Sequence, residues 1–247
     1  MITRILLYIS SILLILVLNI YDPVGIEIPH YSVNNPGASC IGCDAETCYS
    51  LWGVNPDVDL TIYEGAESYV QVNKPVEFLG EEFTLWFTYP ILSENHPIYF
   101  LDHKIDSFFY HKKLSKNLIV EAVKIFNALQ QEYGTPDNVW QVYRQPDVEG
   151  MSGHFGSSPV EAANIQDWME ERIKKALMSS ENTKIGLVFE WYLIEKTPQL
   201  ESEYIKKVNE VTGKAHDLSV KMELMQEIKG NWDLTITYHL ATDRLEK

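Results

Sequence analysis

The chain has little of what usually assigns a sequence to a class. It contains only three cysteines in 247 residues, and it has no Asn-x-Ser/Thr sequon, no internal repeat and no low-complexity tract. The missing sequon favours a bacterial envelope over a eukaryotic secretory route. Basic side chains are scarce, with 20 Lys and Arg against 35 Asp and Glu. A general nucleic-acid binder is therefore excluded, because phosphate contacts need basic patches. What is present, 45% hydrophobic and 22% charged residues, is globular composition.

No catalytic or cofactor motif is complete. The nearest approach to the nucleophile pattern Gly-x-Ser-x-Gly is Gly150-Met151-Ser152-Gly153-His154, which ends in histidine and lies in a glycine-rich segment. None of the seven histidines shows His-Glu-x-x-His spacing, and the sequence contains neither a calcium loop nor a phosphate loop. We therefore expect no cofactor, and we keep an enzyme only as an alternative.

One long apolar run is present, and it is N-terminal. Residues 5–20 carry only two serines and one asparagine as interruptions, and Tyr21-Asp22-Pro23 ends the run. This length lies between a signal-peptide core and a full transmembrane helix, and the residues that follow fit a cleavage site poorly. We expect 1–21 to be an uncleaved signal anchor, with a cleaved signal peptide as the main alternative and a buried helix as the lesser one.

Charge around this run predicts the orientation. Arg4 precedes it, and Asp22 and Glu27 follow it. Because positive charge stays on the cytoplasmic side, we expect a single-pass protein of the cell membrane whose C-terminal domain lies on the extracytoplasmic, periplasmic side. If the signal is cleaved, the same domain is exported.

Acidic side chains concentrate in the third of the chain next to the membrane segment. Residues 27–102 hold twelve of them, against Lys74 as the single basic residue. Such a segment is either a solvated face that keeps the domain soluble or a surface that steers a basic protein partner. Tryptophans that we expect to be exposed add contact residues. The candidate partner-binding residues are Asp57, Asp59, Glu64, Glu67, Trp52 and Trp86.

The three cysteines lie close together in residues 22–59, which are rich in proline and glycine and which we expect to form an irregular linker. In an exported protein we expect a disulfide, Cys43 with Cys48 or Cys40 with Cys48, and one unpaired thiol. Two alternatives stay open. One is a structural metal site of three thiolates with His30, and the other is thiol-redox chemistry by Cys40 and Cys43.

Residues 60–247 carry the periodicity of a folded domain. Apolar steps of three and four predict a helix over 116–133 capped by Ser115, a second that begins at the capping box Ser158-Pro159-Val160-Glu161, and a third over 198–211. Alternation with period two predicts strands. We expect these at 60–63, 67–72, 83–89, 98–101, 107–111, 139–143, 185–193, 220–224 and 232–240.

Short connections between the strands favour antiparallel pairing. We therefore expect an α+β fold in which two or three helices cover one face of an antiparallel sheet. Glu190 lies on the second face of its strand among apolar residues. It is either an exposed or edge-strand glutamate, which we favour, or a carboxylate in partly apolar surroundings with a raised pKa.

These features predict a membrane-tethered exported domain that binds a protein partner through an acidic surface, without catalysis. A toxin-neutralising role and an envelope role both fit. The alternative is an extracytoplasmic enzyme, either thiol-redox at Cys40 and Cys43 or hydrolytic near His154. A third hypothesis is a metal-dependent structural module at the cysteines.

Overall fold

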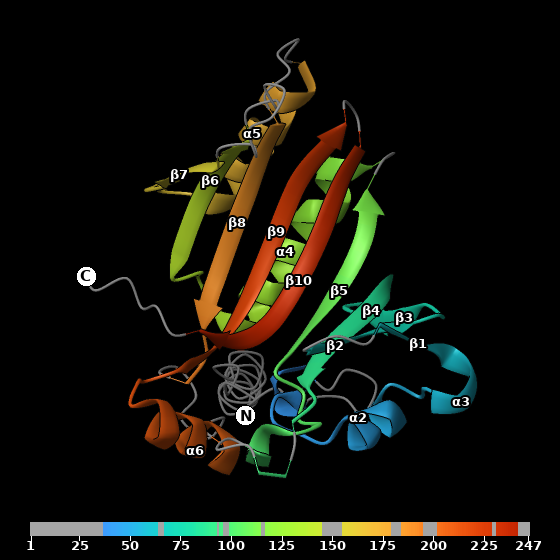
Figure 1. Cartoon of the computed structure of the whole chain (residues 1–247). Coiled ribbons are helices and arrows are strands. Elements are labelled where there is room, and N and C mark those ends of the chain that lie inside the picture. The colour runs from blue at the N-terminus through green and yellow to red at the C-terminus, as the bar shows by residue number, and fades with distance from the viewer. Residues whose placement is uncertain are drawn as a thin grey trace, which may run out of the picture. The chain divides into compact units, whose positions relative to one another are not determined.

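The chain folds around one large, mostly antiparallel sheet. A computed structural model describes residues 37–63, 67–92, 94–95, 99–114, 117–144, 155–178, 184–194, 202–228 and 231–241. All of them belong to one compact unit, Ser32–Lys247. The strand order is β1-β2-β4-β5-β10-β9-β8-β6-β7, and β3 pairs with β4 beside this path (Figure 1). The strands are β1 (Leu60–Tyr63), β2 (Glu67–Val72), β3 (Val76–Phe78), β4 (Glu81–Pro90), β5 (Ser107–Leu114), β6 (Asn138–Arg144), β7 (Phe155–Pro159), β8 (Lys184–Tyr192), β9 (Asp217–Ile228) and β10 (Asn231–Ala241).

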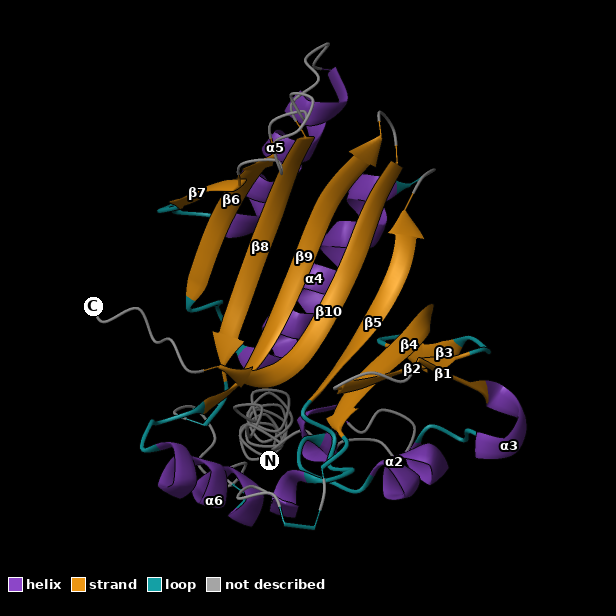
Figure 2. Cartoon of the chain, in the orientation of Figure 1, coloured by secondary structure: helices purple, strands orange, loops and turns teal. Residues whose placement is uncertain are grey.

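Helices cover one face and one end of this sheet (Figure 2). The helical elements are η1 (Gly37–Cys40), α2 (Ala45–Leu51), α3 (Pro56–Asp59), η2 (Tyr99–Leu101), α4 (Leu118–Tyr133), α5 (Ile165–Met178) and α6 (Glu203–Thr212). With strands that pair in hairpins and helices inserted between them, the described residues form the predicted α+β fold.

Ring contacts place α2, α4 and α5 on the same face of the sheet, which we call the inner face. Just beyond α2, Trp52 lies 5.5 Å from Phe87 of β4. Phe126 of α4 and Trp168 of α5 lie 5.1 Å and 6.4 Å from Phe189 of β8, measured between ring centroids. The strand register joins Phe87 to Phe189 through alternate, same-side positions across β5, β10 and β9. The opposite side of the sheet is the outer face.

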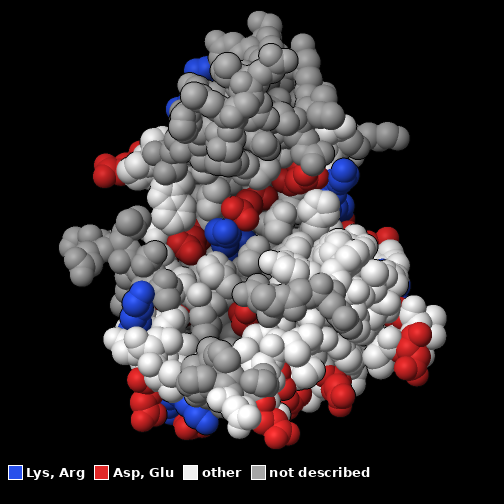
Figure 3. Space-filling model, in the orientation of Figure 1, with Lys and Arg blue, Asp and Glu red and all other residues white. Residues whose placement is uncertain are grey.

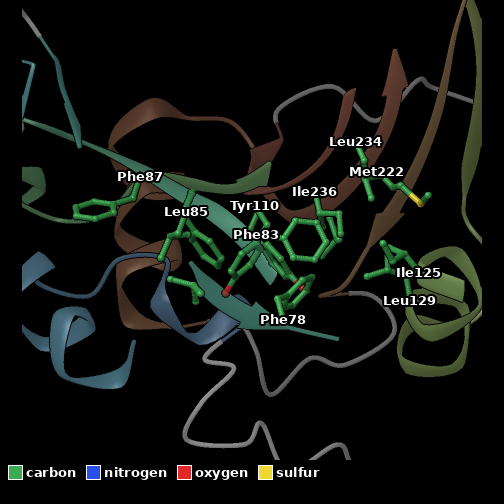
Figure 4. Close-up of a cluster of buried hydrophobic side chains, with 14 of the residues drawn as sticks. Phe78, Phe83, Leu85, Phe87, Tyr110, Ile125, Leu129, Met222, Leu234 and Ile236 are labelled. Atoms are coloured by element: carbon green, nitrogen blue, oxygen red, sulfur yellow. The ribbon is translucent and has the colours of Figure 1, made fainter. Parts of the chain in front are cut away.

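The core fills the space between the inner face and these helices (Figure 4). Its densest part is aromatic: Phe78 stacks on Tyr110 with 4.0 Å between ring centroids, and Phe108 stacks on Tyr238 at 4.7 Å. All four side chains are buried. Burial of one such side chain contributes about 1.5–3 kcal/mol. This aromatic cluster, which Phe83 of β4 joins at 5.9 Å from Phe78, therefore fixes β3, β4, β5 and β10 relative to one another.

Residues 37–59 differ from the irregular linker expected over 22–59. They form η1, α2 and α3, and the helical spacing of Ala45, Cys48, Tyr49 and Trp52 buries all four side chains against the inner face. The physical reason is the i, i+3, i+4, i+7 apolar pattern, which produces one apolar side even in a helix of seven residues. The folded domain therefore includes this segment.

Most predicted elements over 60–247 are confirmed, with shifted ends. The first predicted helix is α4, and β1 and β2 have the expected bounds. Two predictions are wrong. The segment 99–101 is the 3-10 helix η2, not a strand, and Ser158 and Pro159 end strand β7 instead of opening a helix. Strand pairing with β6 overrides the local capping signal there, and α5 begins at Ile165.

The N-terminal predictions fall outside the described residues. This holds for the apolar run 5–20, for the linker residues 22–36 and for His30. Among the helices that the structure describes, none is both long enough and apolar enough to cross a membrane. Attachment to the membrane stays a prediction.

Candidate functional site

The outer face carries a group of aromatic side chains on four neighbouring strands, which we call the aromatic row: Tyr63, Tyr69, Trp86 and Phe109. Trp86 stacks on Tyr63 and on Phe109, with 6.0 Å between ring centroids in each case. Tyr63 and Tyr69 are register partners on β1 and β2 and are 50% and 47% exposed. Figure 3, in which the helices α4 and α5 lie behind the sheet, shows mostly uncharged surface in the region of β2 and the adjoining part of β4. The row therefore offers partly exposed rings to solvent.

A pair of carboxylates lies on the same face as the aromatic row. Glu77 of β3 and Glu82 of β4 are directly opposite each other in the register, and both are exposed. The two-residue turn between the strands has Leu79 and Gly80 at φ 51° and 70°, the left-handed conformation that tight hairpins require. Like charges at opposite register positions destabilise a sheet. The turn therefore maintains an unfavourable charge pair.

The nearest cation of the described chain, Lys112, forms its ion pairs with Glu81 and Glu121, not with Glu77 or Glu82. Within the described ranges, no lysine, arginine or histidine forms an ion pair with Glu77 or Glu82. Both carboxylates line a solvent-open hollow of about 520 Å³, together with Gly80, Glu81 and Lys112. A basic side chain from another molecule has room to enter there.

Other carboxylates of residues 27–102, which we call the acidic third, already form ion pairs within the chain. Asp59 is half-buried and pairs with Lys74 at 2.7 Å, and Asp44 pairs with Lys104 at 2.7 Å. Hydrogen bonding from Lys74 lowers the pKa of Asp59. Asp59 also accepts a bond from the backbone N–H of Asn55, so its role is to fix α3. Of the two α3 candidates, Asp57 is the exposed one.

Glu81 belongs to a network that joins β4, β5 and α4. Its carboxylate lies 2.7 Å from the Lys112 Nζ and 2.5 Å from the Lys124 Nζ, and Lys112 also pairs with Glu121 at 3.2 Å. Hydrogen bonds from Lys112, and then from Lys124, lower the pKa of Glu81 to about 2. This carboxylate therefore stays ionised and paired at every physiological pH.

The network predicts a pH dependence of stability. Because the pKa of Glu81 is lowered from 4.5 on folding, its contribution is complete above about pH 4.5 and disappears as the pH falls towards 2. We expect Glu81→Gln to lower the free energy of unfolding by less than about 1 kcal/mol per ion pair at neutral pH. Urea unfolding at a series of pH values measures this difference, which should shrink towards zero in acid. A difference that grows in acid would contradict the assignment.

The remaining predicted contact residues do not share one environment. Trp52 is 6% exposed and packs on Phe87 and Phe108, so the prediction that it is exposed is wrong. The reason is the short helix α2, which directs the Trp52 side chain into the core. Trp86 lies half-buried in the aromatic row. Glu67 opens β2 opposite Pro90, and Glu64 lies outside the described residues.

The three cysteines come together as free thiols around Cys48. The Cys48 thiol donates to the Cys40 carbonyl at 4.0 Å, and the Cys40 and Cys43 side chains lie close enough to influence its pKa. Cys40 and Cys48 are buried, and Cys43 is half-buried. Cys48 is therefore the shared neighbour in both of the disulfides that the sequence predicts, and the disulfide stays a prediction.

Thiol acidity in this cluster is unlike that of redox catalysts. Hydrogen bonding with Cys48 and burial raise the pKa of Cys43, and hydrogen bonding with Cys40 together with burial raises the pKa of Cys48. Thiol-redox enzymes lower the pKa of the attacking thiol, because the thiolate is the nucleophile. This environment therefore does not favour the redox alternative.

Neither of the other chemical alternatives gains support. In the described part of the chain, no three His, Cys, Asp or Glu side chains have a metal-binding arrangement. His103 and Asp102, which are adjacent in the sequence, pair with each other at 2.8 Å, and Asp102 accepts a bond from the Leu92 N–H. His154, the centre of the hydrolytic alternative, lies outside the described residues.

Glu190 is buried, whereas the sequence predicts an exposed side chain. It is 6% exposed, so the expected exposed or edge-strand glutamate is wrong. The Tyr192 hydroxyl and the Ser219 hydroxyl each donate to it at 2.9 Å, and the Asn138 amide donates at 3.4 Å. One carboxylate therefore binds donors from β6, β8 and β9.

Sequence reasoning missed the Glu77–Glu82 pair and the tyrosines of the aromatic row. The sequence predicts no hairpin there because the turn is Leu79-Gly80, not the usual Asn-Gly or Asp-Gly signal. The alternation of Val76 and Phe78, followed by Phe83 and Leu85, was the available sign. Tyr63 and Tyr69 meet only through the β1–β2 register.

Comparison of the chain with protein-family models, with characterised proteins and with solved structures yields no match. The proposal for function consequently rests on the geometry described above.

Proposed function

We propose that this chain is a membrane-tethered exported domain that binds a protein partner with a basic surface, without catalysis. The observation that carries the proposal is the exposed pair Glu77 and Glu82, held opposite each other without a cation from the described residues. A basic side chain of a partner would relieve this repulsion, so partner binding explains why the arrangement persists. Exposed Asp57 adds to the same field, and such a field accelerates association with a basic protein.

In this function the predicted membrane segment 5–20 would tether the domain, and the acidic third would attract the partner. Tethering limits the search for a partner to the membrane surface, and a toxin-neutralising or an envelope role would both use that arrangement. Glu64, Glu67 and Trp86 stay candidate contacts, whereas Asp59 is assigned to the fold through Lys74.

A crosslinked pull-down of the tagged full-length protein from its native membranes tests the proposal. We expect a stoichiometric partner at low salt and its loss at high salt. The triple variant Asp57→Lys, Glu77→Lys and Glu82→Lys should lose the partner at low salt as well. A matched control reverses three exposed carboxylates outside the acidic third, Glu161, Glu171 and Glu210. The proposal would be contradicted if the first variant kept the partner, or if this variant and the control lost it equally.

A further inference from the structure

The aromatic row and the carboxylate pair belong to one continuous surface. Trp86 follows Glu82 by four residues on β4, so both side chains point to the outer face, about 13 Å apart along the strand. Thr61, Gln71, Trp86 and Phe109 are successive register partners across β1, β2, β4 and β5. None of these four side chains is charged. An uncharged aromatic surface therefore adjoins the unrelieved carboxylates.

Tyr63 and Tyr69 form the accessible end of this surface. Each is about half exposed, and Trp86 supports the Tyr63 ring from one side. In the sequence, Glu64 directly follows Tyr63, and Glu67 precedes Tyr69 by two residues. Aromatic rings within an acidic segment attract a cation by two independent effects, the ring quadrupole and the field of the carboxylates.

The chemistry of this surface favours an arginine side chain over a lysine side chain. A guanidinium group is planar and weakly hydrated, so it stacks on an aromatic ring while its edge donates to carboxylates. A lysine ammonium is compact and strongly hydrated, and it gains mainly from the field of the carboxylates. Nucleic acid is not the occupant, because the surrounding charge repels phosphate.

We infer that the partner docks an arginine side chain on Tyr63 and Tyr69, while Glu77 and Glu82, about 20 Å away along β4, attract adjacent basic groups of the same partner. This inference rests on the proposed function and specifies the partner: an arginine-bearing basic surface instead of a lysine-bearing one. It assigns the exposed tyrosines to selectivity and the carboxylates Glu77 and Glu82 to attraction.

The test compares two labelled decapeptides, one of arginine and one of lysine, by fluorescence anisotropy with the full-length protein in detergent. We expect the arginine peptide to bind about two- to fivefold more tightly, the ratio that one exposed cation–π contact supports. The double variant Tyr63→Leu and Tyr69→Leu should bring the ratio to about one and leave the lysine affinity unchanged. Tyr63→Phe with Tyr69→Phe keeps both rings and should keep the ratio.

Tyr99→Leu is the matched control, because Tyr99 is also exposed within the acidic third but lies in η2, outside the sheet. It should keep the arginine preference. Equal binding of the two peptides to the wild type would overturn the inference, as would an equal loss of both peptides in the leucine double variant. Glu77→Gln with Glu82→Gln separates the two proposals. If this variant binds both peptides more weakly than the wild type does, and the wild type binds the two peptides equally, the acidic surface is supported and the arginine inference is contradicted. If the variant binds both peptides as tightly as the wild type does, the acidic surface itself is contradicted.

Discussion

Replacing Glu190 with alanine is expected to lower the free energy of unfolding by at least about 3 kcal/mol. The substitution removes the acceptor of two buried hydroxyls and one amide, contributed by Tyr192, Ser219 and Asn138. Each hydrogen bond to a charged group contributes about 1.5–3 kcal/mol, and the Tyr192 and Ser219 hydroxyls that lose their acceptor are buried. For a domain of this size the loss corresponds to a fall in Tm of about 6–12 °C.

A neighbouring glutamate provides the control for this prediction. Glu223 lies on β9, on the same face of the sheet, but its side chain is 29% exposed and pairs with Lys221 at 3.3 Å. Glu223→Ala should cost about 0.5 kcal/mol, as a surface ion pair does. Glu190→Gln keeps the size of the side chain and should fall between the two. Chemical denaturation followed by tryptophan fluorescence measures all three. Equal losses for Glu190→Ala and Glu223→Ala would contradict a structural role for the Glu190 network.

Phe78→Ala is expected to destabilise the fold by about 3–5 kcal/mol and to weaken partner binding at the same time. Phe78 is 1% exposed and stacks in parallel on Tyr110, with Phe83 and Tyr238 meeting it edge-on at 5.9 and 6.3 Å. Together with Val76, it attaches the three-residue strand β3 to the core. Removing its ring leaves a cavity and releases Glu77, its chain neighbour, from its position opposite Glu82.

Phe109 supplies the comparison, because it is a half-buried phenylalanine on the outer face. Phe109→Ala should cost less than half as much, since less apolar area returns to water. Partner binding after Phe78→Ala should fall at temperatures where circular dichroism still reports a folded domain, because the hairpin is disturbed before the sheet. Full binding by a destabilised Phe78→Ala would show that the position of Glu77 is not needed.

Local sequence patterns predicted the larger part of the fold. Apolar steps of three and four along α4 and alternation along β8 and β10 are long enough for the periodicity to be unambiguous, and those elements are where they were expected. Elements shorter than about two turns or four residues were misassigned, because so few positions do not define a period. This explains α2, β3 and η2.

The candidate site was predictable in charge but not in geometry. The excess of carboxylates in 27–102 is a count, so it needs no structure. Which carboxylates are available depends on partners distant in sequence. Asp59 is occupied by Lys74, and Glu81 is occupied by Lys112 and Lys124. The same holds for the tryptophans, since Trp52 meets Phe87 and Phe108 across more than thirty residues of chain.

The sequence by itself determined the acidic character of the membrane-proximal third, the single apolar run at the N-terminus, and the alternation of long strands with helices, because each of these depends on composition or on neighbours a few residues away. Only the tertiary structure decided that Cys40, Cys43 and Cys48 meet around one thiol, that Glu190 is buried, and that Glu77 opposes Glu82 beside exposed tyrosines. The physical reason is register. A strand pairing brings together residues with no sequence relation, and a shift of one residue would turn Glu190, Glu77, Glu82 and the tyrosines to the other face. The cysteines meet instead because the apolar side of α2 packs against the core.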